Sequence, residues 1–189
     1  GLDVFDRCRS EVIAGQFLDV TAQARGRADV ETAMTVLRYK SAKYSIERPL
    51  HVGAALAGAS DEATTALRAY GLPLGEAFQL RDDLLGVFGD AAETGKPAGD
   101  DLMEAKATVL LSLAEDRLTG DDAALIARLG TPNLAPSDVD HLASVIRDSG
   151  VADELEAMIA DAVEAGLDCL KAPPLAAAGV AGLRDAASA

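Results

Sequence analysis

Two adjacent aspartates, Asp82 and Asp83, carry the strongest chemical signal in the sequence. They lie in a segment expected to be helical from about residue 74 to residue 88, and Gln79 precedes Asp83 by about one helical turn. Adjacent carboxylates beside an apolar helix face are costly to desolvate unless a cation lies between them. Mg²⁺ is the natural candidate, because it binds through carboxylates, waters and substrate phosphate oxygens. The alternative is a solvated acidic face on an acidic protein.

Three lysines lie in segments suited to binding phosphate. Lys40 stands beside Ser41 in YKSAKYS, Lys96 lies in the glycine-rich stretch TGKPAGDD, and Lys106 follows in EAKAT. Each lysine alone is more typical of a solvated surface charge. Together with the paired aspartates they suit a diphosphate, because carboxylates hold Mg²⁺ against phosphate oxygens and lysines add positive charge. The glycine-rich stretch is not a Walker loop, and GxGxxG is absent from the sequence.

The composition indicates that helices must position these residues. Alanine and leucine are abundant, only 4% of the residues are aromatic, and no segment alternates like a strand bounded by hairpin turns. The expected helices cover about 4–24, 29–47, 52–59, 61–70, 74–88, 102–117, a short segment from 121, 137–149, 151–170 and 175–186. Short loops between them predict an antiparallel all-α helical bundle, in a single domain over residues 1–189.

Helical spacing also predicts which faces of two helices point inward. On the first helix the predicted inner face comprises Val12, Ile13, Gln16, Phe17 and Val20. On the helix with the paired aspartates it comprises Phe78, Leu80, Leu84, Leu85, Val87 and Phe88. We expect both faces to contribute to the core.

Charge, length and cysteine usage exclude several classes of protein. The formal net charge of −14 argues against nucleic-acid binding and against anionic membrane surfaces, which require basic patches. No apolar run reaches the roughly 18 residues of a transmembrane helix, and the first residues do not resemble a signal peptide. Cys8 and Cys169 are far apart in the sequence and suit no metal site, so we expect a reducing, cytoplasmic location.

Five segments together resemble one protein family. AFQLRDDLLGVFGD, TGKPAGDDL and EAKAT look like the second aspartate-rich region of the trans-isoprenyl diphosphate synthases, or polyprenyl synthetases. These enzymes make geranyl, farnesyl, geranylgeranyl and longer diphosphates. EVIAGQFLD resembles their upstream Gly-Gln-x-x-Asp helix, and YKSAKYS resembles their Lys-Thr/Ser segment. The motifs follow the family order with similar separations and cover nearly the whole chain.

The resemblance implies an isoprenoid synthase-like fold and a role for each motif residue. Asp82 and Asp83 would bind Mg²⁺ on an allylic diphosphate and, with Lys40, would be the catalytic residues. The diphosphate would be held by Lys40, Ser41, Gln79, Lys96 and Lys106. Gln16 and Asp19 would face the reacting carbons and the metal cluster from the facing helix.

The resemblance also implies a reaction. Family enzymes ionise the allylic substrate to a carbocation, which isopentenyl diphosphate attacks before a proton is lost. Metal and lysine charge would stabilise the departing diphosphate, and a dry, helix-lined cavity would protect the cation from water. The ring of Tyr44 would line this cavity near the cation; the alternative is a core tyrosine with a bonded hydroxyl.

Two features depart from the family pattern. The second motif usually reads Asp-Asp-x-x-Asp, and its last position here is Gly86, which we regard as a tolerable loss of one carboxylate. The first aspartate-rich motif and the arginines that follow it would precede the Gly-Gln-x-x-Asp helix, and they are absent from this sequence. We therefore expect the C-terminal part of a larger synthase fold, which is incomplete at the N-terminus. Alone, it should be inactive and bind metal poorly.

Two other functions stay open beside a homodimeric prenyltransferase. The chain could be a non-catalytic partner subunit of a heteromeric synthase, although a scaffold has no use for the lysine and aspartate set. It could also belong to a class I terpene cyclase with the same fold, although cyclases need no second diphosphate substrate. The product chain length depends on residues before the first aspartate-rich motif, which this sequence lacks.

Overall fold

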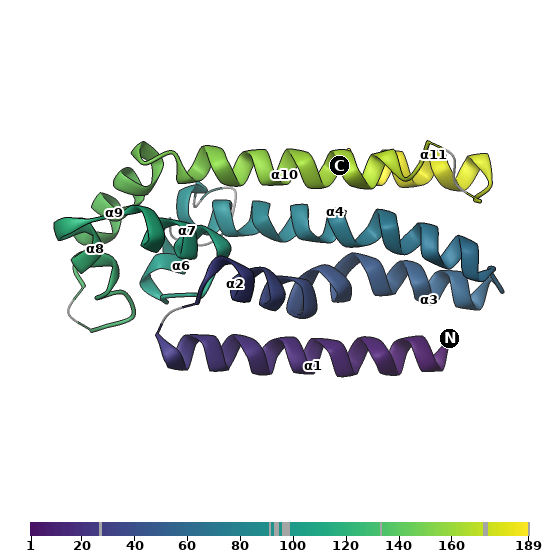
Figure 1. Cartoon of the computed structure of the whole chain (residues 1–189), viewed down its shortest axis with the longest axis horizontal. Coiled ribbons are helices and arrows are strands. Elements are labelled where there is room, and N and C mark those ends of the chain that lie inside the picture. The colour runs from purple at the N-terminus through teal and green to yellow at the C-terminus, as the bar shows by residue number, and fades with distance from the viewer. Residues whose placement is uncertain are drawn as a thin grey trace. The chain divides into compact units, whose positions relative to one another are not determined.

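The computed structural model describes residues 1–26, 28–90, 92, 95, 99–132, 134–171 and 174–188. All the secondary structure in these ranges is helical, as Figure 1 shows, which confirms the all-α prediction. No helix in the described part is long and apolar enough to cross a bilayer. The chain divides into two compact units: the first comprises 1–18, 35–79 and 158–189, and the second comprises 19–34 and 80–157. A single domain over 1–189 stays a prediction.

The described helices follow one another along the chain. Their bounds are α1 (Leu2–Arg25), α2 (Val30–Leu37), the π-helix η1 (Arg38–Glu47), α3 (Arg48–Leu56), α4 (Asp61–Phe88), α6 (Asp100–Met103), α7 (Val109–Arg117), α8 (Gly120–Ile126), α9 (Pro136–Asp148), α10 (Val151–Asp168) and α11 (Ala177–Ala186). Local signals explain several of the ends. Asp29 Oδ1 accepts a hydrogen bond from Thr32 N at 2.7 Å just before α2, and Ser60 Oγ accepts one from Ala63 N at 3.2 Å at the start of α4.

The two helices expected over 61–70 and 74–88 form one continuous helix, α4, and the predicted break between them is wrong. Pro73 lies inside this helix, where its ring removes a backbone hydrogen bond. The flanking residues Tyr70 and Leu74 are buried in a core cluster with Leu170. Burial of these large apolar side chains outweighs the lost hydrogen bond, so the helix continues through the proline.

The single helix expected over 102–117 is divided into α6 and α7, so this prediction is also wrong. Ala105, in the connection, has φ of +51°, a left-handed conformation that ends the helix before it. Thr108 then caps α7, because its Oγ accepts a hydrogen bond from Leu111 N at 3.2 Å. The left-handed alanine sets the direction in which the chain leaves α6.

Replacing Ala105 by glycine is expected to raise the free energy of unfolding by about 1 kcal/mol, because glycine adopts positive φ without a clash at Cβ. Urea denaturation of the two chains measures the difference. Ala157 provides the control, since it is exposed on α10. The same substitution there should lower the free energy by about 1 kcal/mol. Two changes of the same sign would contradict strain at Ala105.

The predicted inner faces are partly wrong. On α1, Ile13 and Val20 are exposed and Phe17 is 71% exposed, whereas Gly15, Asp19 and Ala22 are buried. On α4, the core comprises Leu80, Leu84 and Val87 as expected, but Phe78 and Leu85 are exposed. Helical spacing identifies an apolar face, but it does not say which segment of chain covers it.

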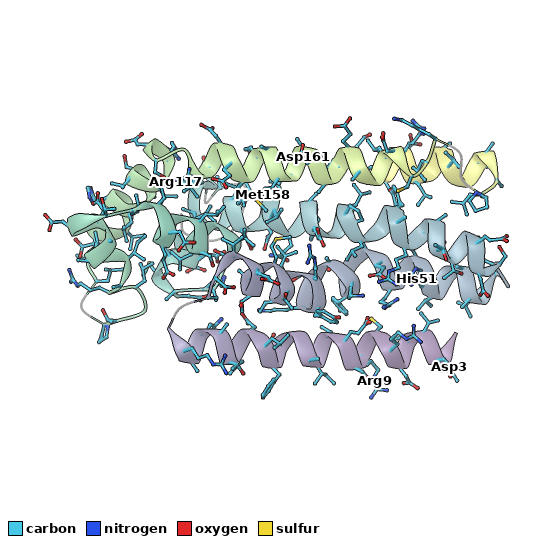
Figure 2. All side chains as sticks on the ribbon, viewed as in Figure 1. Asp3, Arg9, His51, Arg117, Met158 and Asp161 are labelled. Atoms are coloured by element: carbon cyan, nitrogen blue, oxygen red, sulfur yellow. The ribbon has the colours of Figure 1, made fainter. Side chains whose placement is uncertain are left out.

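The first unit also contains a buried group of charged side chains that the sequence reading missed. Arg48 donates to Glu11 from Nε at 2.6 Å and from Nη2 at 2.7 Å, and Lys43 Nζ lies 3.2 Å from Glu47 Oε2. His51 on α3 (Figure 2) joins the group. Arg48 Nη1 lies 2.8 Å from His51 Nδ1. Burial lowers the pKa of His51, so the ring is held in its neutral form.

Candidate functional site

The segment YKSAKYS lies in η1, a π-helix that the sequence reading did not expect. Its wider hydrogen bonding shows at its end, where Arg48 N donates to Lys43 O, five residues earlier. Turns of π-helix are rare and are frequent at functional sites. This segment therefore has an unusual backbone where the predicted phosphate-binding residues lie.

Two glycines hold η1 close to its neighbours in the first unit. A Cβ atom on Gly15 of α1 would lie 2.5 Å from the carbonyl carbon of Tyr39 and 2.7 Å from Lys40 Cα. A Cβ atom on Gly75 of α4 would lie 2.6 Å from Ala42 O and 2.7 Å from its Cα. Only glycine permits backbone contacts this short. The start of η1 is thus fixed between α1 and α4.

This packing positions several predicted ligands of the first unit. Gln16 follows Gly15 on α1 and is exposed, and Lys40 and Ser41 are half-buried on η1. Gln79 lies one turn after Gly75 on α4 and is also half-buried. Tyr44 is exposed, so the alternative of a core tyrosine is excluded for the described chain. The close approach at the two glycines brings the backbones of these three segments together.

The second unit holds the predicted metal ligands. Asp82 is exposed and Asp83 is buried on the same part of α4, between the core residues Leu80 and Leu84. Asp19 of α1 is buried, and its Oδ1 accepts a hydrogen bond from Gln23 Nε2 at 3.2 Å. The predicted ligands are therefore divided between the two units, and their meeting in one diphosphate site remains a prediction.

Lys106 is a half-buried cation of the second unit with two carboxylate partners. Its ammonium group donates to Asp101 Oδ1 and lies 3.3 Å from Glu104 Oε2. Burial would lower the pKa of Lys106, but the hydrogen bond and charge of Asp101, with those of Glu104, outweigh it and raise the pKa. The lysine therefore stays charged, as a phosphate-binding role requires. Lys96 lies outside the described residues.

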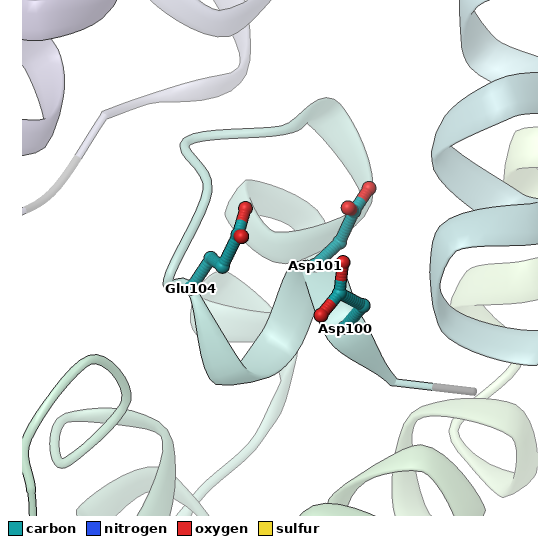
Figure 3. A group of neighbouring side chains, drawn as sticks. All are labelled: Asp100, Asp101 and Glu104. Atoms are coloured by element: carbon teal, nitrogen blue, oxygen red, sulfur yellow. The ribbon is translucent and has the colours of Figure 1, made fainter. Parts of the chain in front are cut away.

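The two carboxylate partners of Lys106 belong to a group of three acidic residues. Asp100, Asp101 and Glu104 each have a carboxylate oxygen within 4.8 Å of those of the other two. Figure 3 shows the three side chains, which lie on α6 and directly after it. Asp101 is buried, Asp100 is half-buried and Glu104 is exposed. Asp100 and Asp101 lie in the motif TGKPAGDDL and Glu104 in EAKAT, and the sequence alone assigned no role to them. Of these three carboxylates, only that of Asp101 is buried.

The sequence contains a signal for only part of the buried group of charged side chains in the first unit. Lys43, Glu47 and His51 recur at intervals of four residues, which places them on one helical face. Their partner Glu11 lies 37 residues before Arg48, and no local pattern connects the two. Helical spacing therefore indicates that Lys43, Glu47 and His51 share a face, but it does not indicate that Arg48 pairs with Glu11.

Comparison with known proteins assigns the family. The polyprenyl synthetase family matches residues 1–146 of this chain. Among curated proteins, the geranylfarnesyl diphosphate synthase of Aeropyrum pernix is 33% identical over 171 residues, which are 90% of this chain and 52% of that protein. The corresponding enzyme of Natronomonas pharaonis is 34% identical over 92% of this chain and 49% of its own length. The chain belongs to the polyprenyl synthetase family, the trans-isoprenyl diphosphate synthases.

Solved structures share the helical arrangement. The geranylgeranyl pyrophosphate synthase of Corynebacterium glutamicum, complexed with isoprenyl diphosphate and magnesium, is 44% identical with a TM-score of 0.92. The match covers 98% of this chain and 53% of that one. This chain therefore spans about half the length of the relatives it matches.

Proposed function

We propose that the protein containing this chain is a Mg²⁺-dependent trans-prenyltransferase, which condenses an allylic diphosphate with isopentenyl diphosphate into a longer polyprenyl diphosphate. The observation that carries the proposal is the pair Asp82 and Asp83 on α4, in a chain of the polyprenyl synthetase family. A relative with both an isoprenyl diphosphate and magnesium in its crystal structure supports the choice of ligands.

The residues present fit a magnesium ion. Asp82 and Asp83 offer carboxylate oxygens, the donors that Mg²⁺ prefers, at the edge of a buried helix face. When bound, Mg²⁺ supplies positive charge that stabilises the diphosphate as it leaves. We propose these two aspartates as its ligands, with Asp19 facing them from α1.

The lysines and amides would act on the diphosphate directly. Lys40 and Lys106, with Lys96, would bind its oxygens, and Ser41 and Gln79 would donate hydrogen bonds to the remaining ones. As the allylic carbon–oxygen bond breaks, its electron pair leaves with the diphosphate, and these cations stabilise the new charge. The double bond of isopentenyl diphosphate then attacks the allylic cation, and loss of a proton completes the condensation. Gln16 and Tyr44 would lie beside the reacting carbons.

The test is to incubate the natural protein that contains this chain with radiolabelled isopentenyl diphosphate, geranyl diphosphate and Mg²⁺. We expect label in longer, acid-labile prenyl products, and loss of the products on chelation of the metal. The 189-residue chain assayed alone should be inactive. Labelled isopentenyl diphosphate that never enters a longer product would overturn the proposal and favour a non-catalytic subunit. A hydrocarbon formed from farnesyl diphosphate alone would favour a cyclase.

The same proposal extends to assembly and location. We propose a homodimer, as the family resemblance implies, and a cytoplasmic protein, in keeping with Cys8 and Cys169, which are both free thiols. Sedimentation equilibrium of the natural protein distinguishes the homodimer from a monomer or a heteromer.

A further inference from the structure

The missing carboxylate of the second aspartate-rich motif has a counterpart elsewhere in the second unit. Gly86 stands at the motif position where the family pattern has a third aspartate. It lies three residues after Asp83 and four after Asp82, so a side chain there would share their helical face. The question is what occupies the space beside this glycine.

The carboxylate of Asp101 occupies that space. A Cβ atom on Gly86 would lie 2.5 Å from Asp101 Cγ and 3.1 Å from its Oδ1, and Oδ2 is the nearest atom of all. A contact this short leaves no room for any side chain at position 86 while Asp101 keeps this place. Asp101 is only 7% exposed, so its carboxylate is held in place and is not a mobile surface charge.

Lys106 orients this carboxylate. Its ammonium group binds Asp101 Oδ1, while Oδ2 is the oxygen closest to Gly86. One oxygen is thus used by the lysine, and the other is directed to the helix that carries Asp82 and Asp83. The ion pair also offsets the cost of burying the aspartate.

We propose that Asp101 supplies the third carboxylate of the Asp82/Asp83 cation site, in place of the aspartate that Gly86 replaces. The carboxylate comes from α6 instead of from the next turn of α4, and it reaches the same face of the helix. Gly86 is then not a tolerated loss but the residue that admits the substitute. This inference rests on the proposed function, because it assumes that Asp82 and Asp83 bind a divalent cation.

A carboxylate swap tests the proposal. Mn²⁺ is titrated into the 189-residue chain with inorganic diphosphate present, and binding is followed by water-proton relaxation, which detects weak sites without turnover. Asp101→Asn, which keeps the size of the side chain, is expected to weaken Mn²⁺ binding about tenfold. Gly86→Asp combined with Asp101→Ala returns the carboxylate to α4, and we expect it to restore the affinity. Asp153→Asn, at an exposed aspartate of α10 outside this acidic group, is the control and should leave it unchanged.

Substitution of the glycine alone separates fit from metal binding. Gly86→Ala should lower both the melting temperature and the Mn²⁺ affinity, because the new Cβ atom displaces Asp101. Adding Asp101→Ala to it should restore the melting temperature but not the affinity. A purely structural Asp101–Lys106 ion pair predicts that neither Asp101→Asn nor the swap changes Mn²⁺ binding, and that result would overturn the inference.

The same Mn²⁺ titration distinguishes failure of the inference from failure of the proposed function. If Asp82→Asn with Asp83→Asn abolishes Mn²⁺ binding while Asp101→Asn does not change it, the cation site stands and the role of Asp101 is wrong. If the double asparagine variant binds Mn²⁺ as well as the unaltered chain, both are wrong. If the unaltered chain binds no Mn²⁺, only the inference is wrong, because the activity is proposed for the protein that contains this chain.

Discussion

Replacing Glu47 by alanine is expected to lower the free energy of unfolding by about 3–5 kcal/mol, the range found when one partner of a buried ion pair is removed. Glu47 is 0% exposed, and Lys43 Nζ and Arg48 Nη1 each lie 3.2 Å from its carboxylate. Both cations are themselves buried, and Glu11 is the other carboxylate that pairs with them. Two positive charges then share one negative charge inside the first unit.

Stability is lost because a cation stays buried, away from water, without a negative charge to compensate it. In the intact group, two carboxylates balance the ammonium and the guanidinium, and Arg48 and Lys43 outweigh burial to lower the pKa of Glu11. Without Glu47, an uncompensated cation stays away from water. Guanidinium chloride denaturation measures the loss, and the fraction of helix from circular dichroism shows whether the chain still folds.

A surface ion pair provides the control for Glu47. Glu156 on α10 pairs with Arg81 on α4, and its side chain is 49% exposed. Glu156→Ala should cost about 1 kcal/mol or less, because exposed pairs are screened by water. Equal losses at the two positions would show that the buried group contributes no more than a surface pair.

Gly75→Ala is expected to lower the free energy of unfolding by about 2–3 kcal/mol, although alanine favours helices. The new Cβ atom would meet the Ala42 backbone, 2.6 Å from its oxygen and 2.7 Å from its Cα. Backbone atoms in a helix cannot rotate away as a side chain can, so η1 must shift as a whole. The variant should also weaken inorganic diphosphate binding by the natural protein, because Lys40 and Ser41 move with η1.

The same substitution at Gly53 is the matched control. Gly53 lies in α3, and nothing lies within 4 Å of a Cβ atom built there. Gly53→Ala should therefore raise the free energy of unfolding by about 0.5–1 kcal/mol through helix propensity alone. Urea titrations that give the two variants changes of the same sign would contradict the close packing of Gly75 on η1.

Much of the helical content followed from the sequence because its signals are local. The Asp29 cap, the start of α8 near Asp121 and the helix from Val151 depend on residues within one or two turns of each other. The paired aspartates and the order of the motifs are also properties of the linear chain. They were sufficient to identify the family before any contact was known.

Long-range packing decided the rest. Pro73 predicts a break from the sequence, but Tyr70 and Leu74 bury enough surface against Leu170 to keep α4 whole. The exposed face of α1 shows the reverse case, since Ile13 has the spacing of a core residue without a covering partner in the described chain. In both cases, burial depends on whether a segment that is distant in the sequence packs against the helix.

The aspartate-rich helix α4 separates most clearly what the sequence determines from what the tertiary structure decides. The sequence by itself determined that Asp82 and Asp83 are adjacent on an amphipathic helix and that Gly86 lacks the third carboxylate of the family motif. Only the tertiary structure decided that Asp101 lies against that glycine, with Lys106 on its other oxygen. The sequence of the helix shows that position 86 has no side chain. The segment that fills the space beside it lies beyond the end of this helix in the sequence and reaches it only when the chain folds.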